Sequence, residues 1–527
     1  MTSNTSSKII SIMGTVLLAT AIIAAEPGTA LHRTGWNSKA KQRFMHPPTL
    51  TYTPVKDAAK YRCTVTFTEP LQEAVSLESA TPEFDLTPVW SKLPDAGKFQ
   101  VITQALNSDG NALSSCTSNC DKMMPFKGQH LPAACSYTES ADKTIQWILK
   151  KRPTAYTQSF PSLGLFSFIR LFSTYPVLFP QSPHAKECID AATEYAQRLL
   201  QGSTPADYVY AHMPPTHVDY KKHVHGNTHA DPGVMLVPDQ EVLQVARCGM
   251  IGSAYLMLYK ATKDKTWLDA ANRIADTLKK TQLPEGRWPF RVIPKDGSIV
   301  INYTSDQALP ILLFDELIRE HGRADLKPTL DKAVMWMLEN PCRTYLWTHE
   351  YDDLGAFVPY DNLEFYDALH FIEYLLRHAS PQNDYEKVSN DLMQYIEDQF
   401  VEWGEAPRHP TPGVLQDKGG LNQITPGVRE QYKCYNIIAG HSAFYIRTCL
   451  NFYAKTKDEI WLKKSRAMAD TLTAVQHPDG YYPTWMDAES QSGEPLKIGY
   501  KDVWPNDTAF IAEMLYRLDV LLKAKAR

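Results

Sequence analysis

The sequence predicts an all-α protein, an (α/α)6–7 toroid of helical hairpins with an irregular N-terminal segment. Three observations lead to this prediction. Apolar residues recur with a helical period over most of the chain beyond residue 140, a two-helix unit is repeated, and strands do not alternate with helices. The 527 residues are 43% hydrophobic and 21% charged, so the chain can bury a large core.

The N-terminus has the layout of a secretory signal peptide. Lys8 precedes an apolar run from Ile9 to Ile23, and the small residues Ala24 and Ala25 follow. The run is shorter than the roughly 20 residues of a transmembrane helix. We therefore expect a signal peptide at 1–25, a secreted or periplasmic protein, and no stable membrane insertion after cleavage. An uncleaved membrane anchor is the alternative.

Two further regions follow the signal peptide. Residues 26–140 are rich in Pro, Ser and Thr, so we expect an irregular N-terminal segment there, with one strand indicated by the Thr-Val-Thr-Phe-Thr alternation at 64–68. Residues 141–527 are expected to form the catalytic helical barrel. Its predicted helices are the amphipathic runs at about 184–202, 239–261, 266–281, 306–321, 326–339, 362–378, 384–403, 436–454, 460–476 and 507–524.

An internal repeat sets the architecture. Many residues between Thr262 and Pro289 recur, 194 positions later, between Thr456 and Pro483. Each copy has a long helix, a short turn, a second helix and a closing loop of the form Gln-x-Pro-x-Gly-x-aromatic-Pro. Because a single hairpin cannot bury its own apolar face, hairpins of this kind stack into an open solenoid or close into a ring. With ten to fourteen helices expected, we predict a ring of six or seven hairpins, whose closing loops lie at one mouth.

The closing loop of the first copy is the first candidate site. It contains Arg287, Trp288 and Arg291, and Tyr303 follows shortly after. A guanidinium group suits a carboxylate because it donates two parallel hydrogen bonds, and a Tyr beside an Arg can exchange a proton. The second copy keeps the aromatic residue and the Pro but lacks both arginines. We interpret the shared residues as structural and the arginines as functional, although Trp288 could also contact substrate.

Three other segments contribute candidates. His349 and Asn362 flank an acidic loop before a predicted helix, where Asn362 could be a simple helix cap. A dense polar and aromatic run before another helix contains Arg429, Gln431, Tyr432 and Tyr435, with Arg429 and Glu430 as a solvated pair in the structural alternative. A histidine-rich segment ends at His229, which could act as a general base or lie in a solvated loop.

The net charge and the sequence motifs limit which partners and cofactors we expect. The chain has 54 Lys+Arg and 59 Asp+Glu, a net charge of -5, so we expect no nucleic-acid partner, and a polyanion would need a locally basic cleft. No nucleotide-binding glycine loop is found, and we expect no cofactor. The nine cysteines include Cys116, Cys120 and Cys135, whose spacing fits a disulfide better than a zinc site, so no metal is expected.

Three strings resemble one known family. They are Gln282-Leu-Pro-Glu-Gly-Arg-Trp-Pro-Phe-Arg-Val with Tyr303-Thr-Ser, then Ile396-Glu-Asp-Gln-Phe-Val-Glu-Trp403, then Glu430-Gln-Tyr-Lys-Cys-Tyr435. Together they resemble the secreted α-toroid uronate-cleaving lyases of polysaccharide lyase family 38, over about residues 235–525. The segment Asn436-Ile-Ile-Ala-Gly-His441 departs from the family pattern, which bears Pro and Asp there.

The resemblance implies β-elimination on a β-1,4-linked polyuronate such as glucuronan or mannuronan, the alginate type. A Tyr and a His would handle protons and an Arg would hold the substrate carboxylate, which we match to Tyr303, His229 and Arg291. The remaining candidates would bind the acidic polysaccharide.

Other functions remain open at this stage. A glycoside hydrolase on the same fold would use a carboxylate pair drawn from Asp306, Glu350, Asp352, Asp353 or Glu430. A sugar epimerase and a non-catalytic glycan-binding protein are further alternatives. The sequence does not fix the oligomeric state.

Overall fold

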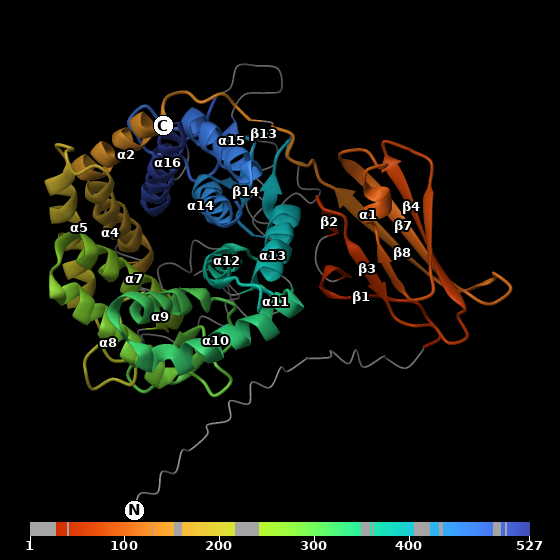
Figure 1. Ribbon diagram of the computed structural model, residues 1–527, viewed down its shortest axis with the longest axis horizontal. Coiled ribbons are helices and arrows are strands. Elements are labelled where there is room, and N and C mark those ends of the chain that lie inside the picture. Colours follow the sequence, from red (N-terminus) through yellow and green to blue (C-terminus); the bar gives the residue numbers. More distant parts are fainter. Residues whose placement is uncertain are drawn as a thin grey trace, which may run out of the picture.

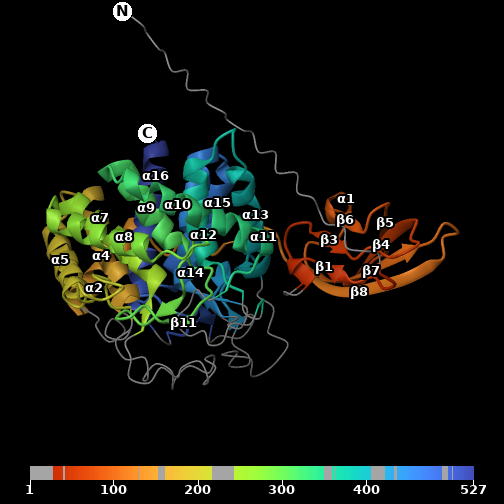
Figure 2. The same cartoon turned by 90° about the horizontal axis from the view of Figure 1, so that it is seen from below.

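The computed structural model of the protein describes residues 28–38, 42–128, 130–151, 161–216, 242–348, 359–360, 363–404, 422–431, 436–488, 497–500 and 503–526. These residues form a ring of helices with a pair of β-sheets beside it (Figures 1 and 2). The predicted signal peptide lies outside the described residues.

The ring has an inner and an outer layer of helices. Each inner helix contacts the next, and the last contacts the first, in the order α4 (Pro161–Leu178), α7 (Val245–Thr262), α9 (Ala308–His321), α12 (Tyr366–His378), α14 (Ala439–Thr456) and α16 (Pro505–Ala526). Each packs in the same order against one outer helix: α5 (Ala185–Gln201), α8 (Lys265–Thr281), α10 (Lys327–Glu339), α13 (Tyr385–Phe400), α15 (Glu459–Val475) and α2 (Tyr137–Lys151). The predicted toroid is confirmed, with six hairpins in the described part of the chain (Figure 1).

The ring closes by joining the two ends of the helical region. The C-terminal helix α16 pairs with α2, the first long helix of the chain. Neither α2 nor α4 is among the predicted helices. Helix α4 contacts α5, α7 and α16 and is therefore covered on most sides, so its sequence is apolar nearly all round and lacks the amphipathic period.

The repeat corresponds to hairpins α7–α8 and α14–α15, which occupy opposite positions in the ring (Figure 1). In both, the first helix ends at a lysine with positive φ, Lys263 at 61° and Lys457 at 60°. The carboxylate of the next residue then accepts a hydrogen bond from the second helix, from Thr266 N to Asp264 and from Ile460 N to Asp458. The repeated residues therefore include the turn chemistry of the hairpin.

The glycine of each closing loop fits only because it has no side chain. Gly286 and Gly480 have φ of 104° and 106°. A Cβ at Gly286 would lie 2.5 Å from the carbonyl oxygen of Lys332 on α10, and one at Gly480 would lie 2.4 Å from that of Lys143 on α2. Each loop thus touches the outer helix of the following hairpin, which shows that α2 follows α15 in the ring as α10 follows α8.

Replacing Gly480 by alanine should weaken this closure. The variant combines an unfavourable φ with a backbone clash, so we expect the free energy of unfolding to fall by more than about 1 kcal/mol. Gly110, at φ 84° and with no atom within 4 Å of the place that an added Cβ would take, is the matched control because its alanine variant adds strain without a clash. Thermal unfolding of both variants checks this, and an equal loss in the two would contradict the closure contact.

The N-terminal segment forms two β-sheets, so the prediction of an irregular segment is wrong. A five-stranded sheet has the order β2 (Arg43–Phe44), β8 (Ala112–Lys122), β7 (Gly97–Leu106), β4 (Lys60–Glu69) and β5 (Val75–Ser79). A three-stranded sheet has the order β1 (Arg33–Thr34), β3 (Thr49–Tyr52) and β6 (Glu83–Asp85). Two short helices also lie in this segment, the 3-10 helix η1 (Trp36–Ser38) and the α-helix α1 (Thr87–Trp90).

The two sheets share a core of their own. Val65 and Phe99 of the large sheet belong to the same buried cluster as Tyr52 and Phe84 of the small one. Along β4 buried residues alternate with partly exposed ones, as in the predicted strand at 64–68. Strand β8 was missed because its exposed positions include Ser115, Thr117 and Asn119, residue types that are also typical of loops.

The sheets dock on outer helix α13 through polar contacts. The Asp398 carboxylate accepts hydrogen bonds from the backbone N–H groups of Met45 (2.7 Å) and His46 (2.8 Å). The Gln399 side chain donates to the carbonyl of Arg43 (2.8 Å), and Arg43 donates to the carbonyl of Gln399 (3.1 Å). The N-terminal segment is thus fixed to the ring beside α13 (Figure 1).

Two further expectations concern membranes and cysteines. Among the described residues, no helix has both the length and the apolar character needed to cross a bilayer. The eight described cysteines are all free thiols, Cys116, Cys120 and Cys135 among them, so the disulfide suggested for these three is not formed.

Candidate functional site

The candidate site lies at the mouth of the ring where the inner helices begin, which we call the loop mouth. Two small sheets stand there. The first joins β9 (Leu243–Gln244), β10 (Arg291–Val292) and β11 (Ile299–Ile301), and the second joins β12 (Val401–Glu402), β14 (Gly427–Arg429) and β15 (Ile437–Ile438). β9 leads into α7 and β15 into α14, so the sheets follow the repeat. Figure 2 shows β11 at one end of the ring and the end of α16 at the other.

Arg291 is the best-placed of the predicted residues. It lies on β10 between Gln244 and Ile301, is only 1% exposed, and its guanidinium lies 4.7 Å from the centre of the Phe290 ring. The repeat places Trp485 at the corresponding position, where it bridges to Ile438. This position of the repeat therefore has an arginine in the first copy and an aromatic residue in the second.

A second buried arginine, Arg247, lies in the first turn of α7. Its Nε lies 3.8 Å from a carboxylate oxygen of Asp306, and both side chains are almost completely buried. The guanidinium also faces the Tyr366 ring at 5.4 Å. Arg247 was not predicted as a site residue, because α7 is apolar on most sides and one polar residue at its start gives no periodic signal. Arg247 and Arg291 thus bring two buried guanidinium groups to this side of the mouth, of which Arg247 is paired with Asp306.

Asp367 has a structural function at the same mouth. Its two carboxylate oxygens accept hydrogen bonds from the backbone N–H groups of Gln307 (3.1 Å) and Ala308 (3.0 Å), at the start of α9. A carboxylate at this position satisfies helix-terminal N–H groups and stabilises the helix dipole. We therefore assign Asp367 to the fold.

Tyr303 and Arg287 lie on the outer side of the mouth. The Tyr303 hydroxyl donates to the carbonyl of Leu346 (2.8 Å), and its ring lies 6.1 Å from that of Trp336 on α10. Arg287 donates to the backbone and side-chain oxygens of Asn302 and lies over the same indole at 6.0 Å. Both are thus close to Arg291 along the chain, but both also hold the loop against the outer layer.

The prediction that Trp288 binds substrate is wrong. Its side chain is 0% exposed, the indole N–H donates to the carbonyl of Leu278 (2.8 Å), and the ring packs edge-on against Phe314. Tyr482 occupies the corresponding buried position in the second copy. An aromatic ring enclosed in this way has no free face for a sugar, so Trp288 belongs to the core.

Arg429 faces the mouth from the opposite side of the ring. Its Nε donates to Glu402 (2.6 Å), and the same carboxylate oxygen also accepts from Arg43 of the N-terminal sheet. Although burial opposes it, the two guanidinium groups hold the pKa of Glu402 below its usual value. Arg429, Glu430 and Gln431 are all buried, so the alternative of a solvated Arg429–Glu430 pair is wrong.

Only some of the predicted site residues are among the residues that the structure describes. Arg287, Arg291 and Tyr303 belong to one side of the loop mouth, and Arg429 and Gln431 to the other. Five predicted site residues lie outside the described residues: His229, His349, Asn362, Tyr432 and Tyr435. The same holds for three carboxylates of the hydrolase alternative, Glu350, Asp352 and Asp353.

Asp507 is a candidate that sequence reasoning missed. It lies in the first turn of α16, is 6% exposed, and packs so closely on α14 that a Cβ at Gly440 would lie 2.3 Å from its carboxyl carbon. One oxygen accepts from the Asn506 amide (2.9 Å), and the other has no hydrogen-bond partner among the described residues. Burial raises the pKa of Asp507 to about 7. From the sequence, an acid at a helix start is interpreted as a cap.

The raised pKa predicts a pH-dependent effect of Asp507→Asn. The folded-state pKa lies above the unfolded-state value of 3.8, so folding favours the protonated form, and this contribution is lost as the pH rises through about 7. The variant should therefore gain stability relative to the wild type between about pH 4 and pH 8, by about 1.4 kcal/mol per unit of pKa difference. Chemical denaturation at both pH values checks this, and a difference that stays constant would contradict the raised pKa.

Two other groups complete the electrostatics of the site. Burial lowers the pKa of His441, in the first turns of α14, to about 3, so the imidazole is neutral at physiological pH. Among the described residues, the one group with metal-binding geometry is Glu316, Glu320 and His321, at the opposite end of the ring. Lys260 already donates to both of these glutamates, at 2.8 and 2.7 Å, so the group is an ion-paired cluster.

No protein-family model and no curated protein matches the sequence. Solved structures match at low sequence identity. An α-mannanase of glycoside hydrolase family 76 from Bacteroides thetaiotaomicron has a TM-score of 0.50 and 12% identity, covering 75% of this chain and 98% of the mannanase.

Two other matches cover more of this chain. A family 76 glycoside hydrolase from a bovine strain of the same species has a TM-score of 0.49 and 12% identity, over 93% of this chain and 98% of its own. A polysaccharide lyase has a TM-score of 0.40 and 11% identity, over 93% and 64%. The α-mannanase match shows that the helical ring has the (α/α)6 toroid fold.

Proposed function

We propose that the protein is a secreted polysaccharide lyase that cleaves a β-1,4-linked polyuronate, glucuronan or mannuronan, by β-elimination at the loop mouth. The observation that carries the proposal is the position of Arg291. A guanidinium costs desolvation energy when it is buried, and the repeat shows that the fold accepts Trp485 in its place. A function that uses positive charge at the mouth explains why an arginine is there.

The chemistry follows from the substrate. Removal of the C5 proton of a uronate leaves negative charge on its carboxylate, which becomes a dianionic enolate, and a neutralising guanidinium lowers the energy of that state. In this proposal Arg291 provides the neutralisation, with Arg287 or Asn362 as additional donors. The C5 proton passes to His229 or Tyr303, the C4–O4 bond breaks, and Tyr303 protonates the departing oxygen.

Buried guanidinium groups at this mouth support an acidic substrate. Arg291 lies on β10 of the first sheet and Arg247 in the first turn of α7, and both are buried. The whole chain, by contrast, carries a net charge of -5. Asp306 lies beside Arg247, so the two arginines differ in their surroundings. A polyuronate supplies a carboxylate on every sugar, so successive residues of the polymer can meet the arginines.

Tyr303 requires a separate test because its hydroxyl already donates to Leu346. To act as an acid, the hydroxyl must break its hydrogen bond to this carbonyl and donate its proton to the leaving oxygen. We expect Tyr303→Phe to lower turnover by about 100-fold, the lower end of general acid–base contributions, with an unchanged KM. A variant that loses thermal stability but keeps its turnover would instead assign the hydroxyl to loop packing.

Hydrolysis is the second candidate, favoured by Asp507. A carboxyl group with its pKa raised to about 7 is suited to protonate a leaving group near neutral pH. Asp306 is the described carboxylate on the other side of the mouth that could complete a pair. The α-mannanase with the same fold makes a neutral mannan the natural substrate to test for this alternative.

The experiment is a substrate panel with two readouts. The protein is incubated with glucuronan, mannuronan and mannan, while ultraviolet absorbance records unsaturated uronates and a reducing-end assay records all cleavage. The proposal predicts both signals on a polyuronate and neither on mannan. Reducing ends without absorbance would indicate hydrolysis, and no signal on any polyuronate would refute the lyase.

A further inference from the structure

A large cavity lies at the end of the ring opposite to the loop mouth. Its volume is about 730 Å³, and residues of all six inner helices line it. None of the predicted site residues is among its lining residues. The cavity is therefore separate from the site proposed for polysaccharide cleavage.

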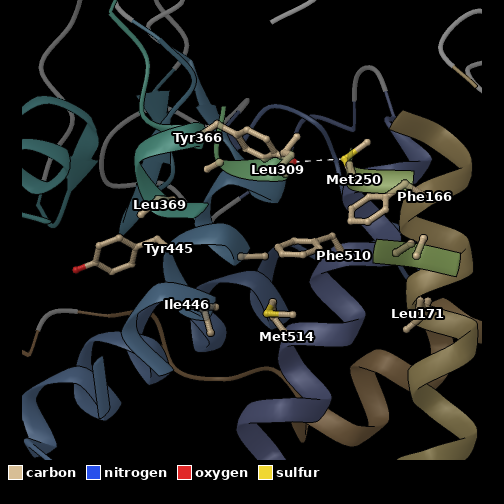
Figure 3. Close-up of a cluster of buried hydrophobic side chains, with 14 of the residues drawn as sticks. Phe166, Leu171, Met250, Leu309, Tyr366, Leu369, Tyr445, Ile446, Phe510 and Met514 are labelled. Atoms are coloured by element: carbon tan, nitrogen blue, oxygen red, sulfur yellow. Dashed lines mark hydrogen bonds between the residues drawn. The ribbon is translucent and has the colours of Figure 1, made fainter. Parts of the chain in front are cut away.

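A layer of apolar and aromatic side chains closes the cavity toward the loop mouth. The Tyr366 hydroxyl lies 3.9 Å from the sulfur of Met250, and Phe444 stacks against Phe510 at 4.1 Å. Figure 3 shows Tyr366, Met250, Leu309 and Phe510 meeting across the interior of the ring. Met250 and Leu309 also line the cavity, so this layer is its floor.

The charged part of the wall has a small excess of cationic side chains. The lining contains six of them, namely Arg170, Lys260, Arg319, Arg377, Arg447 and Arg517, against three carboxylates, namely Glu316, Glu320 and Glu373. Two more carboxylates pair with these cations from behind the wall, Glu513 with Arg170 and Asp315 with Arg377. With these two included, six cations and five anions leave the wall with one excess positive charge, which an anionic ligand would balance.

Helix termini explain some of these cations but not the deepest two. Lys260, Arg319 and Arg377 lie in the last turns of their helices, where a cation stabilises the helix dipole. Arg170 and Arg447 lie about two turns before the ends of α4 and α14 and are largely buried. Each guanidinium therefore lines the middle of the ring rather than a helix end.

Two polar groups in the wall have no hydrogen-bond partner among the described residues. The Ser173 hydroxyl, on a residue only 1% exposed, follows Arg170 by one helical turn. The Asn451 amide nitrogen follows Arg447 by one turn on α14. Each arginine thus has a neutral polar group one turn further along the same helix. Arg170 already donates to Glu513 and Arg447 to Glu373, and each guanidinium has further N–H groups that can donate to an anion.

Most of the other residues of the rim and walls are apolar. Val177 and Val520, on the adjacent helices α4 and α16, are 63% and 37% exposed at the rim. Met257, Leu450 and Leu521 continue this surface inward. A ligand that matches the cavity therefore has an acidic group and an apolar body.

We propose that this cavity binds a small organic anion, a carboxylate or phosphate ester with an aliphatic portion. Its acidic oxygens accept from Arg447, Asn451 and Ser173, and its aliphatic portion packs on the methionines and leucines of the wall. The site does not depend on the reaction at the loop mouth.

Isothermal titration of the full-length protein tests the proposal with four probes. Hexanoate and hexyl phosphate carry both features, hexanol lacks the charge, and inorganic phosphate lacks the apolar body. We expect at least one of the two amphiphilic anions to bind about tenfold more tightly than hexanol and inorganic phosphate. Tighter binding of hexanoate would indicate a carboxylate ligand, and tighter binding of hexyl phosphate would indicate a phosphate ester. Equal binding of hexanol or of inorganic phosphate, or no binding of either amphiphilic anion, would overturn the proposal.

A cavity-filling variant locates the binding. Ser253 lines the cavity and bears no charge, so Ser253→Phe occupies the space without breaking an ion pair. It should abolish binding of the anion and leave polysaccharide cleavage unchanged. If this variant does not fold, Asn451→Leu, which removes one donor, should weaken binding by about tenfold. Unchanged binding in the folded variant would place the ligand elsewhere and contradict the proposal.

Discussion

Replacing Arg291 by methionine is expected to lower kcat/KM on the cleaved polyuronate by about 1,000-fold, the upper range for removal of one charge-stabilising donor. Arg291 is the buried guanidinium at the loop mouth, and in the proposed reaction it neutralises the carboxylate on which charge develops. Because this interaction strengthens in the transition state, the loss should fall mainly on kcat.

The folded state should tolerate this change. Methionine has a similar length without the charge, and the repeat places Trp485 at the corresponding position. Arg62→Met, on the exposed face of strand β4, is the matched control and should keep full activity. Steady-state kinetics and thermal unfolding are measured together. A stable Arg291→Met variant with wild-type turnover would remove Arg291 from the site.

Replacing Glu402 by leucine is expected to lower the free energy of unfolding by about 3–5 kcal/mol. Glu402 is the shared acceptor of Arg43 and Arg429, and all three side chains are almost completely buried. The substitution leaves two buried guanidinium groups without their common carboxylate. It therefore weakens both the docking of the N-terminal sheets and the position of Arg429 at the loop mouth.

Glu78→Leu is the matched control for this loss. Glu78 also pairs with two cations, Lys60 and Arg62, but on the exposed face of the sheet. Water screens that cluster, so we expect no measurable change in stability. Denaturant unfolding of both variants provides the comparison. Similar small effects in the two variants would show that the buried cluster adds nothing to the docking.

Sequence patterns predicted the elements that have one wet and one dry face. Most outer helices have such faces, although α2 has one too and was missed. The repeat predicted that the hairpins form a ring. Helix α4 was missed although α7, another inner helix that is apolar on most sides, was predicted, because the repeated turn follows α7 and not α4. In the N-terminal segment the alternation of β4 was predicted, whereas β8 was missed because Ser, Thr and Asn occupy several of its exposed positions. In both cases the alternation between wet and dry positions that identifies an element was weak or masked by composition.

The candidate site was predictable where the two copies of the repeat differ. Arg291 stood out because the second copy has Trp485, and the structure places both in equivalent bridges beside an inner helix. Arg247, Glu402 and Asp507 were not predicted because their importance depends on burial and on partners distant in sequence. Trp288 was wrongly included because an aromatic residue in a loop looks the same in sequence whether it faces a sugar or the core.

The most direct test of elimination at the loop mouth is to cleave the polyuronate in water enriched in heavy oxygen and to weigh the products. Elimination breaks the C4–O4 bond without adding water, so the account predicts fragments with a C4–C5 double bond and no heavy oxygen from the solvent at the cleavage site. Saturated fragments with one solvent oxygen at each new reducing end would mean hydrolysis and would contradict the account.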